Sequence, residues 1–287
     1  GVNKLATAIK ETLQGKELAG VTPKDIVNPR QINKALKDFI ASSQLSQLMD
    51  QINALSTLTQ KRKMSAVGPG GIKKERASAD VRDIHYTHYG RICAIETPEG
   101  QSIGLINSFT SYAHINDYGF IETPYRPVNK ETGQVENRYE YYMADIEDNS
   151  YICQATEPLT EDNKFVNERI ICRYNNSIVE VPASMVDFMD VSAKQFISAA
   201  TSLIPFLNND DSARALMGAN MQRQAVPLLR PEAPIVGTGM ERKIAYDCGA
   251  LLKAKADGVV TFVSSAYIKV KTKTGTDTYY LTKFEKT

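Results

Sequence analysis

Residues 150–181 read SYICQATEPLTEDNKFVNERIICRYNNSIVEV, and this stretch decides the expected fold class. It contains three short runs rich in isoleucine, valine, tyrosine and cysteine, at 150–153, 170–172 and 178–181, which predict β-strands. Polar turns separate the runs. Because acids and asparagines also become more frequent here, we expect a small β-rich module over residues 124–190, inserted between helical parts.

The segments on either side of this module have helical patterns. In residues 28–40 apolar side chains recur once per turn, Asn28 is a candidate cap and Pro29 suits the first helical position. The segments expected to be helical are residues 3–14, 28–40, 43–49, 56–64 and 215–219. Residues 267–271 alternate apolar and charged side chains before a turn at 274–277, which predicts a β-hairpin. We therefore expect a multi-domain α+β protein with a helical region, the inserted module and a mixed C-terminal region.

The composition is that of an ordinary folded protein. Of 287 residues, 42% are hydrophobic and 23% are charged, which excludes a disordered or collagen-like chain. The net charge of +1 gives no global signature for nucleic acid or for a membrane surface, so any such contact requires local patches. The four cysteines form no Cys-x-x-Cys pair, which argues against a structural zinc site and predicts reduced, mostly buried thiols.

The sequence also bears on location and extent. It has no apolar stretch of about 20 residues and no signal peptide, so we expect a cytoplasmic protein without a membrane partner. It begins with Gly1 rather than Met and stops abruptly at Thr287, which leads us to expect a piece of a larger protein.

Basic residues concentrate around a glycine-rich stretch. Residues 61–76 hold six basic side chains against one acid, for a local charge of +5, on both sides of Gly68-Pro69-Gly70-Gly71. Such a hinge can bring the backbone close to a phosphate. The same composition also suits a solvated charged loop.

Two pairs of polar residues allow either chemistry or structure. His85 and His88 are spaced as metal ligands on one helix face, but hydrogen-bonded structural histidines fit equally and no third ligand is evident. Glu96 and Glu99 flank a proline, where two carboxylates can perform acid–base work or satisfy backbone donors in a tight turn.

An acidic turn and an arginine-containing run follow near the C-terminal third. Asp210 and Asp211 can bind a divalent cation, or one of them can cap the helix that follows. Arg214, Arg223 and Arg230 alternate with amides, a chemistry that suits phosphates, sugars and base edges. The alternative is that these arginines pair with the nearby acids, which are Asp210, Asp211 and Glu232.

Longer strings identify a family. They occur in one order at residues 42–51 (SSQLSQLMDQ), 68–71 (GPGG), 87–91 (THYGR), 96–100 (ETPEG), 118–125 (YGFIETPY), 203–207 (LIPFL), 214–227 (RALMGANMQRQAVP) and 236–242 (VGTGMER). Together they resemble the bacterial RNA polymerase beta subunit family, and the resemblance covers nearly the whole chain.

The resemblance implies an organisation and an activity. The implied regions are the end of the preceding lobe or protrusion (1–29), the fork region with a rifamycin-pocket segment (30–123), an external β-rich module (124–190) and the start of the hybrid-binding region (191–287). The implied activity is DNA-directed RNA synthesis, a nucleotidyl transfer, by the assembled enzyme. In this family the beta-prime subunit holds the Mg²⁺, so no cofactor is expected in this chain and the chain alone should be inactive.

The implied partners are the beta-prime, alpha, omega and sigma subunits, template DNA, RNA and nucleoside triphosphates, in a nucleoid-associated enzyme. By resemblance, Arg214 and Glu99 lie near the incoming nucleotide. The residues expected near the active centre, the RNA–DNA hybrid or downstream DNA are Arg223, Gln224, Asp211, Lys73, Lys74 and Arg76. Two other functions stay open: a non-enzymatic module in which residues 124–190 bind a protein, and a free-standing enzyme that uses the acids.

The resemblance extends to the rifamycin pocket. The implied pocket residues are Gln47, Leu48, Asp50, Gln60, Lys63, Ser65, Ser102 and Ile106. Leu48 stands where the family usually has Phe, Gln60 where it has His, Lys63 where it has Arg and Ser102 where Asn is common. Because an aromatic surface and a guanidinium fork are lost, we expect reduced rifamycin sensitivity.

Overall fold

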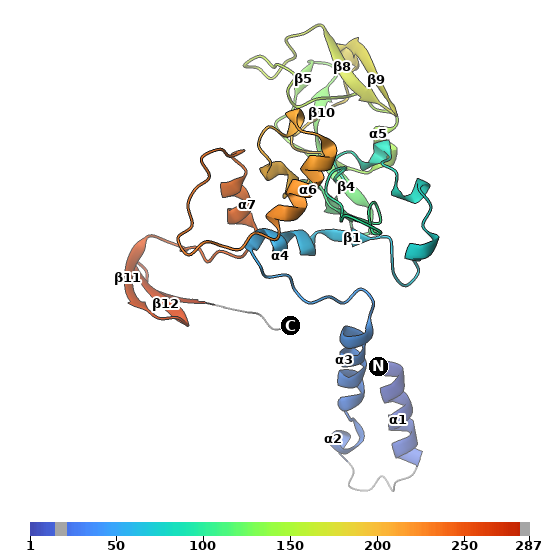
Figure 1. Ribbon diagram of the computed structural model, residues 1–287, viewed down its shortest axis with the longest axis vertical. Helices are drawn as coiled ribbons and strands as arrows, with labels where there is room; N and C mark the ends of the chain where they lie inside the picture. The colour runs from blue at the N-terminus through green and yellow to red at the C-terminus, as the bar shows by residue number, and fades with distance from the viewer. Residues whose placement is uncertain (15–21, 282–287) are drawn as a thin grey trace. The chain divides into compact units, whose positions relative to one another are not determined.

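The computed structural model describes residues 1–14 and 22–281 (Figure 1). It divides into two compact units. One comprises Gly1–Leu48 with Gly68–Gly71, and the other comprises Met49–Val67 with Ile72–Thr287. The structure contains both helices and sheets, which confirms the α+β class. The expected domain boundaries within the chain stay predictions.

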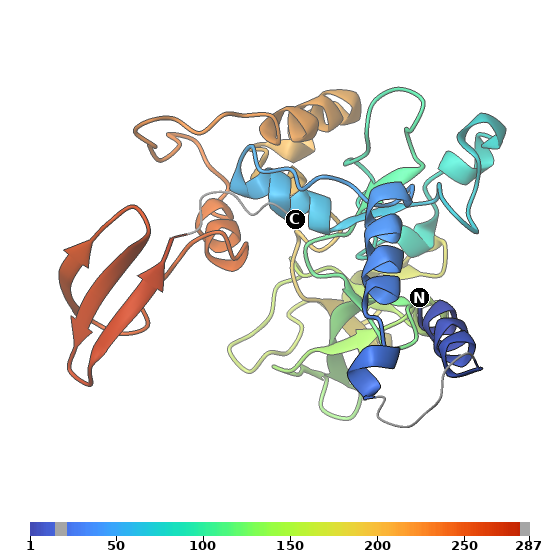
Figure 2. The ribbon, with the colours of Figure 1, turned by 90° about the horizontal axis from the view of Figure 1, so that it is seen from below.

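The first unit is a small helical assembly. Its helices are α1 (Val2–Gln14), α2 (Pro23–Ile26) and α3 (Arg30–Ser42). Helices α1 and α3 contact each other and lie side by side (Figure 2). The predicted helix is confirmed, but it starts one residue later than expected: Pro29 is the N-cap residue instead of the first helical residue, and the Asn28 side chain accepts a hydrogen bond from Arg30 N–H at 3.0 Å.

The helix expected at 43–49 is wrong. Helix α3 continues to Ser42, whose hydroxyl donates back to the Asp38 carbonyl, and Ser43 then ends it with extended backbone angles. The serines that suggested a helix start therefore form a helix end, since a serine hydroxyl can bond to the backbone at either place.

The second unit begins with a helix and a two-stranded sheet. Helix α4 (Ala54–Lys61) starts two residues before the expected Ser56, because Asn53 is the cap, and it ends before Met64. Met64 lies in β1 (Lys63–Ser65), which pairs with β2 (Ile106–Ser108). Three single 3-10 turns follow β1, namely η1 (Lys74–Arg76), η2 (Asp80–Arg82) and η3 (Tyr86–His88). The region up to residue 123 is thus less helical than expected.

The β-rich module is a sheet of eight strands in the order β3-β4-β10-β7-β8-β9, with β5 and β6 both paired to β4. Its elements are β3 (His114–Ile115), β4 (Ile121–Asn129), β5 (Gln134–Val135), β6 (Glu140–Tyr142), α5 (Ala144–Glu147), β7 (Ile152–Cys153), β8 (Arg169–Tyr174), β9 (Ser177–Pro182), η4 (Ala183–Met185) and β10 (Phe188–Asp190). Strands β7, β8 and β9 confirm the three predicted runs. Cys153 and Cys172 are buried free thiols in its core, beside residues such as Ile170 and Met189.

The C-terminal part combines short helices and a second sheet. Its elements are η5 (Thr201–Leu203), η6 (Leu207–Asn209), α6 (Ser212–Gln222), α7 (Glu241–Asp247), β11 (Gly258–Val263), β12 (Tyr267–Thr272) and β13 (Thr276–Tyr280). Strands β12 and β13 confirm the predicted hairpin, while β11 adds a third, unpredicted strand at its edge. None of the helices in the described ranges is long and apolar enough to cross a bilayer.

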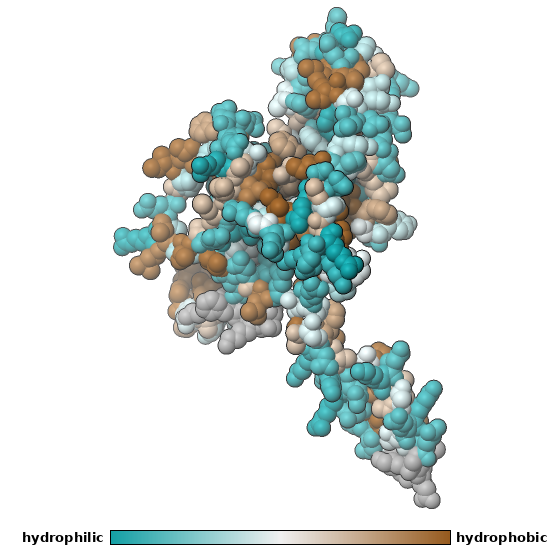
Figure 3. Space-filling model, turned by 45° about the vertical axis from the view of Figure 1, so that its right-hand side comes forward, coloured by the Kyte–Doolittle hydropathy of each residue, from teal (hydrophilic) through white to brown (hydrophobic). Residues whose placement is uncertain are grey.

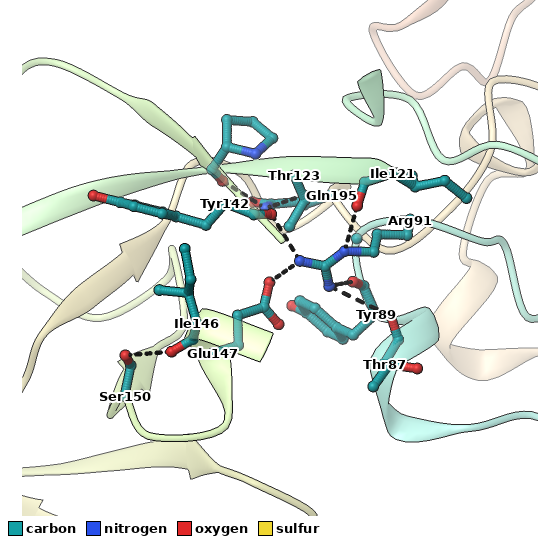
Figure 4. A network of polar contacts seen from close by, with 12 residues as sticks. Thr87, Tyr89, Arg91, Ile121, Thr123, Tyr142, Ile146, Glu147, Ser150 and Gln195 are labelled. Carbon is teal, nitrogen blue, oxygen red and sulfur yellow. Dashed lines mark hydrogen bonds and ion pairs between the residues drawn. The ribbon is translucent and has the colours of Figure 1, made fainter. Parts of the chain in front are cut away.

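A buried guanidinium joins residues 87–91, which we call the fork segment, to the module. Arg91 is only 4% exposed, and it forms an ion pair with Glu147 at the end of α5 (Figure 4). Its nitrogens also donate to four carbonyl oxygens, those of Thr87 (3.4 Å), Tyr89 (3.2 Å), Ile121 (3.1 Å) and Tyr142 (2.8 Å). Beside it, Gln195 donates to the Thr123 hydroxyl at 2.8 Å and to the Pro124 carbonyl at 2.7 Å.

We predict that Arg91→Met lowers the free energy of unfolding by about 3–5 kcal/mol, because it leaves the Glu147 carboxylate buried without a counter-charge. The matched control is Arg138→Met, which removes an exposed arginine from a surface ion pair with Glu136 and should cost less than about 1 kcal/mol. Urea unfolding followed by circular dichroism measures both. Equal losses in the two variants would contradict the importance of the Arg91 contacts.

Candidate nucleic-acid interface

Helix α6 presents one buried and one exposed face. Ala215, Ala219 and Asn220 are buried, whereas Arg214 is exposed. The Asp211 carboxylate accepts a hydrogen bond from Ala213 N–H at 3.1 Å and caps the helix. The capping interpretation of Asp211 is therefore confirmed. Within residues 1–14 and 22–281, no three His, Cys, Asp or Glu side chains are grouped as a metal site requires.

At the other end of α6, Arg223 turns toward residues 96–100, which we call the fork turn. Its Nε lies 3.8 Å from Oε1 of Glu96, and the exposed fractions of the two side chains are 15% and 3%. Its Nη2 donates to the Asn220 side chain at 2.5 Å, and the Asn220 amide donates to the Thr97 carbonyl at 3.1 Å. The acid that pairs with Arg223 is thus Glu96, and the expected pairing with Asp210, Asp211 or Glu232 is wrong for this arginine.

Asn53 ties the start of α4 to the same helix end. Its side-chain oxygen accepts from Ser56 N–H at 2.8 Å and caps α4. Its side-chain amide donates to the carbonyls of Gln222 (3.1 Å), Arg223 (3.3 Å) and Ala225 (2.8 Å). These are carbonyls that a helix end leaves without intrahelical donors. The sequence analysis missed Asn53, since it started this helix at Ser56; an Asn-x-x-Ser spacing is the local signal that could have indicated the cap.

Electrostatically, Glu96 lies between two cations. Burial raises the pKa of Glu96, whereas a hydrogen bond from Ser198 and the charges of Arg223 and Lys63 lower it. Burial lowers the pKa of Lys63, and the Arg223 charge lowers it further, while Glu96 and Asp50 raise it. The charge of one buried carboxylate therefore interacts with both Lys63 on β1 and Arg223 at the end of α6.

The basic residues of 61–76 divide into inward and outward groups. Arg62 donates to the carbonyls of Thr110 at 2.6 Å and Ala113 at 3.2 Å, so it supports the fold. The exposed basic residues after the glycine hinge are Lys73, Lys74 and Arg76. The local charge of the sequence therefore overstates the charge that this segment offers to a ligand.

The structure brings several expected rifamycin-pocket residues together. In the β1–β2 ladder Ser65 lies opposite Ile106, and the amide of Ile106 bonds to the Ser102 carbonyl at 3.3 Å. The Asp50 amide donates to the Gln60 side chain at 2.5 Å. Of the three remaining pocket residues, Lys63 lies on β1 in the second unit, and Gln47 and Leu48 belong to the first unit.

The other candidates have simpler surroundings. Glu99 and Gln224 are exposed. His85 N–H donates to Nδ1 of His88 at 3.1 Å, and Nδ1 of His85 lies 2.8 Å from the Thr87 hydroxyl. This arrangement supports the interpretation of hydrogen-bonded structural histidines.

We predict that Asn53→Ala lowers the free energy of unfolding by about 2 kcal/mol, of which the lost cap contributes about 1 and the lost amide bonds about 1. Asn53→Ser keeps a capping oxygen and loses the amide, so it should show about half of that loss. Denaturant unfolding of the three proteins measures this. If the serine variant matches the wild type, the bonds to the end of α6 contribute nothing.

Comparison with known proteins identifies the family that the chain resembles. The family described as "RNA polymerase Rpb2, domain 3" matches residues 47–115, and "RNA polymerase beta subunit external 1 domain" matches residues 125–192. The chain is 54% identical to the DNA-directed RNA polymerase subunit beta of Clostridium botulinum (strain Alaska E43 / Type E3) over all of its own length. It is 53% identical to that of Acetivibrio thermocellus over 99% of its length. It spans 23% of the length of each of these relatives. Over its whole length the chain therefore matches one segment of the bacterial RNA polymerase beta subunit, and it belongs to that family.

Proposed function

We propose that this chain contributes to DNA-templated RNA synthesis as part of an assembled RNA polymerase, where it lines the active centre and the RNA–DNA hybrid. The observation that carries the proposal is that side-chain hydrogen bonds hold the C-terminal end of α6 in place. Both the fork turn, through Thr97, and the start of α4, through Asn53, hydrogen-bond to its C-terminal end. An arginine-bearing helix held in this way is suited to meet phosphates in one fixed orientation.

The proposed roles follow from exposure and charge. Exposed Arg214 suits the phosphates of an incoming nucleotide, with Glu99 of the fork turn beside that site. Arg223, Gln224 and Asp211 are proposed to line the hybrid and the active centre. The exposed cations proposed to approach downstream DNA are Lys73, Lys74 and Arg76.

The metal chemistry is proposed to belong to a partner. From the similarity of the chain to the RNA polymerase beta subunit, we propose that the beta-prime subunit holds the Mg²⁺ of the assembled enzyme. The isolated chain should then bind without turnover. We propose beta-prime, alpha, omega and sigma subunits as its protein partners, in a cytoplasmic enzyme associated with the nucleoid.

A second candidate function is a protein-interaction module. Figure 3 shows apolar side chains gathered at the end of the module where β5, β8 and β9 lie. Ile171 on β8 and Ile178 on β9 are 58% and 77% exposed, although β-strands usually bury one face. Such a surface suits a protein partner within the same assembly.

The nucleic-acid role is tested by binding a labelled RNA–DNA hybrid to the chain across a salt series. We expect affinity to fall with salt, and the combined change of Arg214→Ala with Arg223→Ala to weaken binding and to reduce the salt slope by about 1–2. Arg138→Ala with Arg169→Ala is the matched control, because both arginines lie on the module. The proposal would be contradicted if the affinity is unchanged in the Arg214→Ala, Arg223→Ala variant, or if it falls equally in the control variant.

The proposed rifamycin pocket gives a separate prediction. An assembled polymerase that carries this chain should need more rifampicin for half inhibition than one that carries Leu48→Phe, Gln60→His and Lys63→Arg together. The changes restore an aromatic surface and a guanidinium fork, each worth about 1 kcal/mol or more. In vitro transcription with both enzymes measures the difference. Equal, strong inhibition of the two enzymes at ordinary doses would overturn the prediction.

A further inference from the structure

Glu96 and Arg223 are buried opposite charges that do not reach a hydrogen bond. Both Oε1 of Glu96 and Nε of Arg223 are buried without a hydrogen-bond partner, and they face each other at 3.8 Å. A buried pair with such geometry recovers little of the free energy that its two charges lose with their water. Stabilisation of the fold therefore does not account for the Glu96–Arg223 pair. The alternative is that the pair orients the Arg223 guanidinium.

The contacts of Arg223 fix the plane of its guanidinium. Nε faces Glu96 and Nη2 bonds to Asn220, which leaves Nη1 without a hydrogen bond among the described residues. Asn220 is itself held by the carbonyl of Thr97. Because a guanidinium is planar and rigid, the hydrogen bond at Nη2 and the attraction of Nε to the Glu96 carboxylate together restrict the direction of Nη1.

The fork turn supplies both constraints. Glu96 acts on Nε directly, and the next residue, Thr97, acts on Nη2 through Asn220. Glu96 also interacts with Lys63, but an ammonium has no fixed fork and cannot replace the guanidinium in this geometry.

We propose that Glu96 is a positioning residue, which together with the Thr97–Asn220 bond holds the Arg223 guanidinium with Nη1 free for a phosphate of the bound nucleic acid. This inference rests on the proposed function, in which Arg223 lines the hybrid. It predicts that removing the acid at Glu96 changes the affinity for the hybrid in the direction opposite to the one that charge predicts. By charge alone, removing an acid beside a polyanion site strengthens binding, whereas loss of positioning weakens it.

The test is a double-mutant cycle on binding of an RNA–DNA hybrid to the chain. Glu96→Gln keeps the shape of the side chain, and it should lower affinity about threefold to tenfold in the wild-type background. In the Arg223→Ala background it should have no further effect, because the residue it acts through is gone. Glu131→Gln, at an exposed acid in the module, is the control. Tighter binding of the Glu96→Gln variant would overturn the proposal.

A second measurement does not need nucleic acid. Magnetic resonance of the Arg223 Nε–H group should show slow proton exchange in the wild type and at least tenfold faster exchange in Glu96→Gln, with the amide spectrum of the module unchanged. If no variant binds the hybrid but the exchange changes as expected, the proposed function fails and the positioning stands. If the exchange is the same in both proteins, Glu96 does not orient Arg223 and the inference is wrong, whatever the binding data.

Discussion

The charge of Arg91 is the constraint on which the second unit depends. A guanidinium that is 4% exposed must be matched by an anion and by acceptors, because an uncompensated buried charge is costly. Its partners come from segments up to 56 residues away, namely the end of α5, β4 and β6. If the fork segment separated from the module, the charge of Arg91 would be exposed or would lose its counter-ion and its acceptors. The module is therefore attached to the fork segment by buried polar contacts.

The same kind of contact assembles the candidate interface. Asn53 reaches the Ala225 carbonyl across 172 residues of sequence, and the Asn220 amide reaches the Thr97 carbonyl across 123. Each of these bonds gives a backbone carbonyl a side-chain donor from a distant segment. Two segments that are far apart in sequence are thus placed at one end of α6, with directional bonds that fix orientation more strictly than apolar contact does.

Local signals predicted the elements well, and long-range partners could not be predicted. The cap at Asp211, the start of α3 near Asn28 and the strands of the module follow from rules that act over a few residues. The partner of Arg62 lies 48 residues away. Because the Arg62 side chain turns inward to this partner, it supports the fold and does not add to the exposed positive charge that the sequence predicted. The helix expected at 43–49 failed for a related reason, because a serine can cap either end and only its neighbours decide.

In this nearly neutral chain, whether an arginine side chain points into the protein or toward solvent distinguishes a structural role from a binding role. Arg62, Arg91 and Arg173 have inward partners, and Arg173 is paired with the buried Asp190 at 2.9 Å. Arg214 is exposed, as a ligand contact requires. Arg223 combines both conditions, since Nη2 is hydrogen-bonded to Asn220 and Nε faces the Glu96 carboxylate, while its side chain keeps 15% exposure. A guanidinium that is hydrogen-bonded at one nitrogen and faces a carboxylate with another loses less freedom when a phosphate binds at the third, and this pre-organisation is what the buried fork-turn carboxylate contributes.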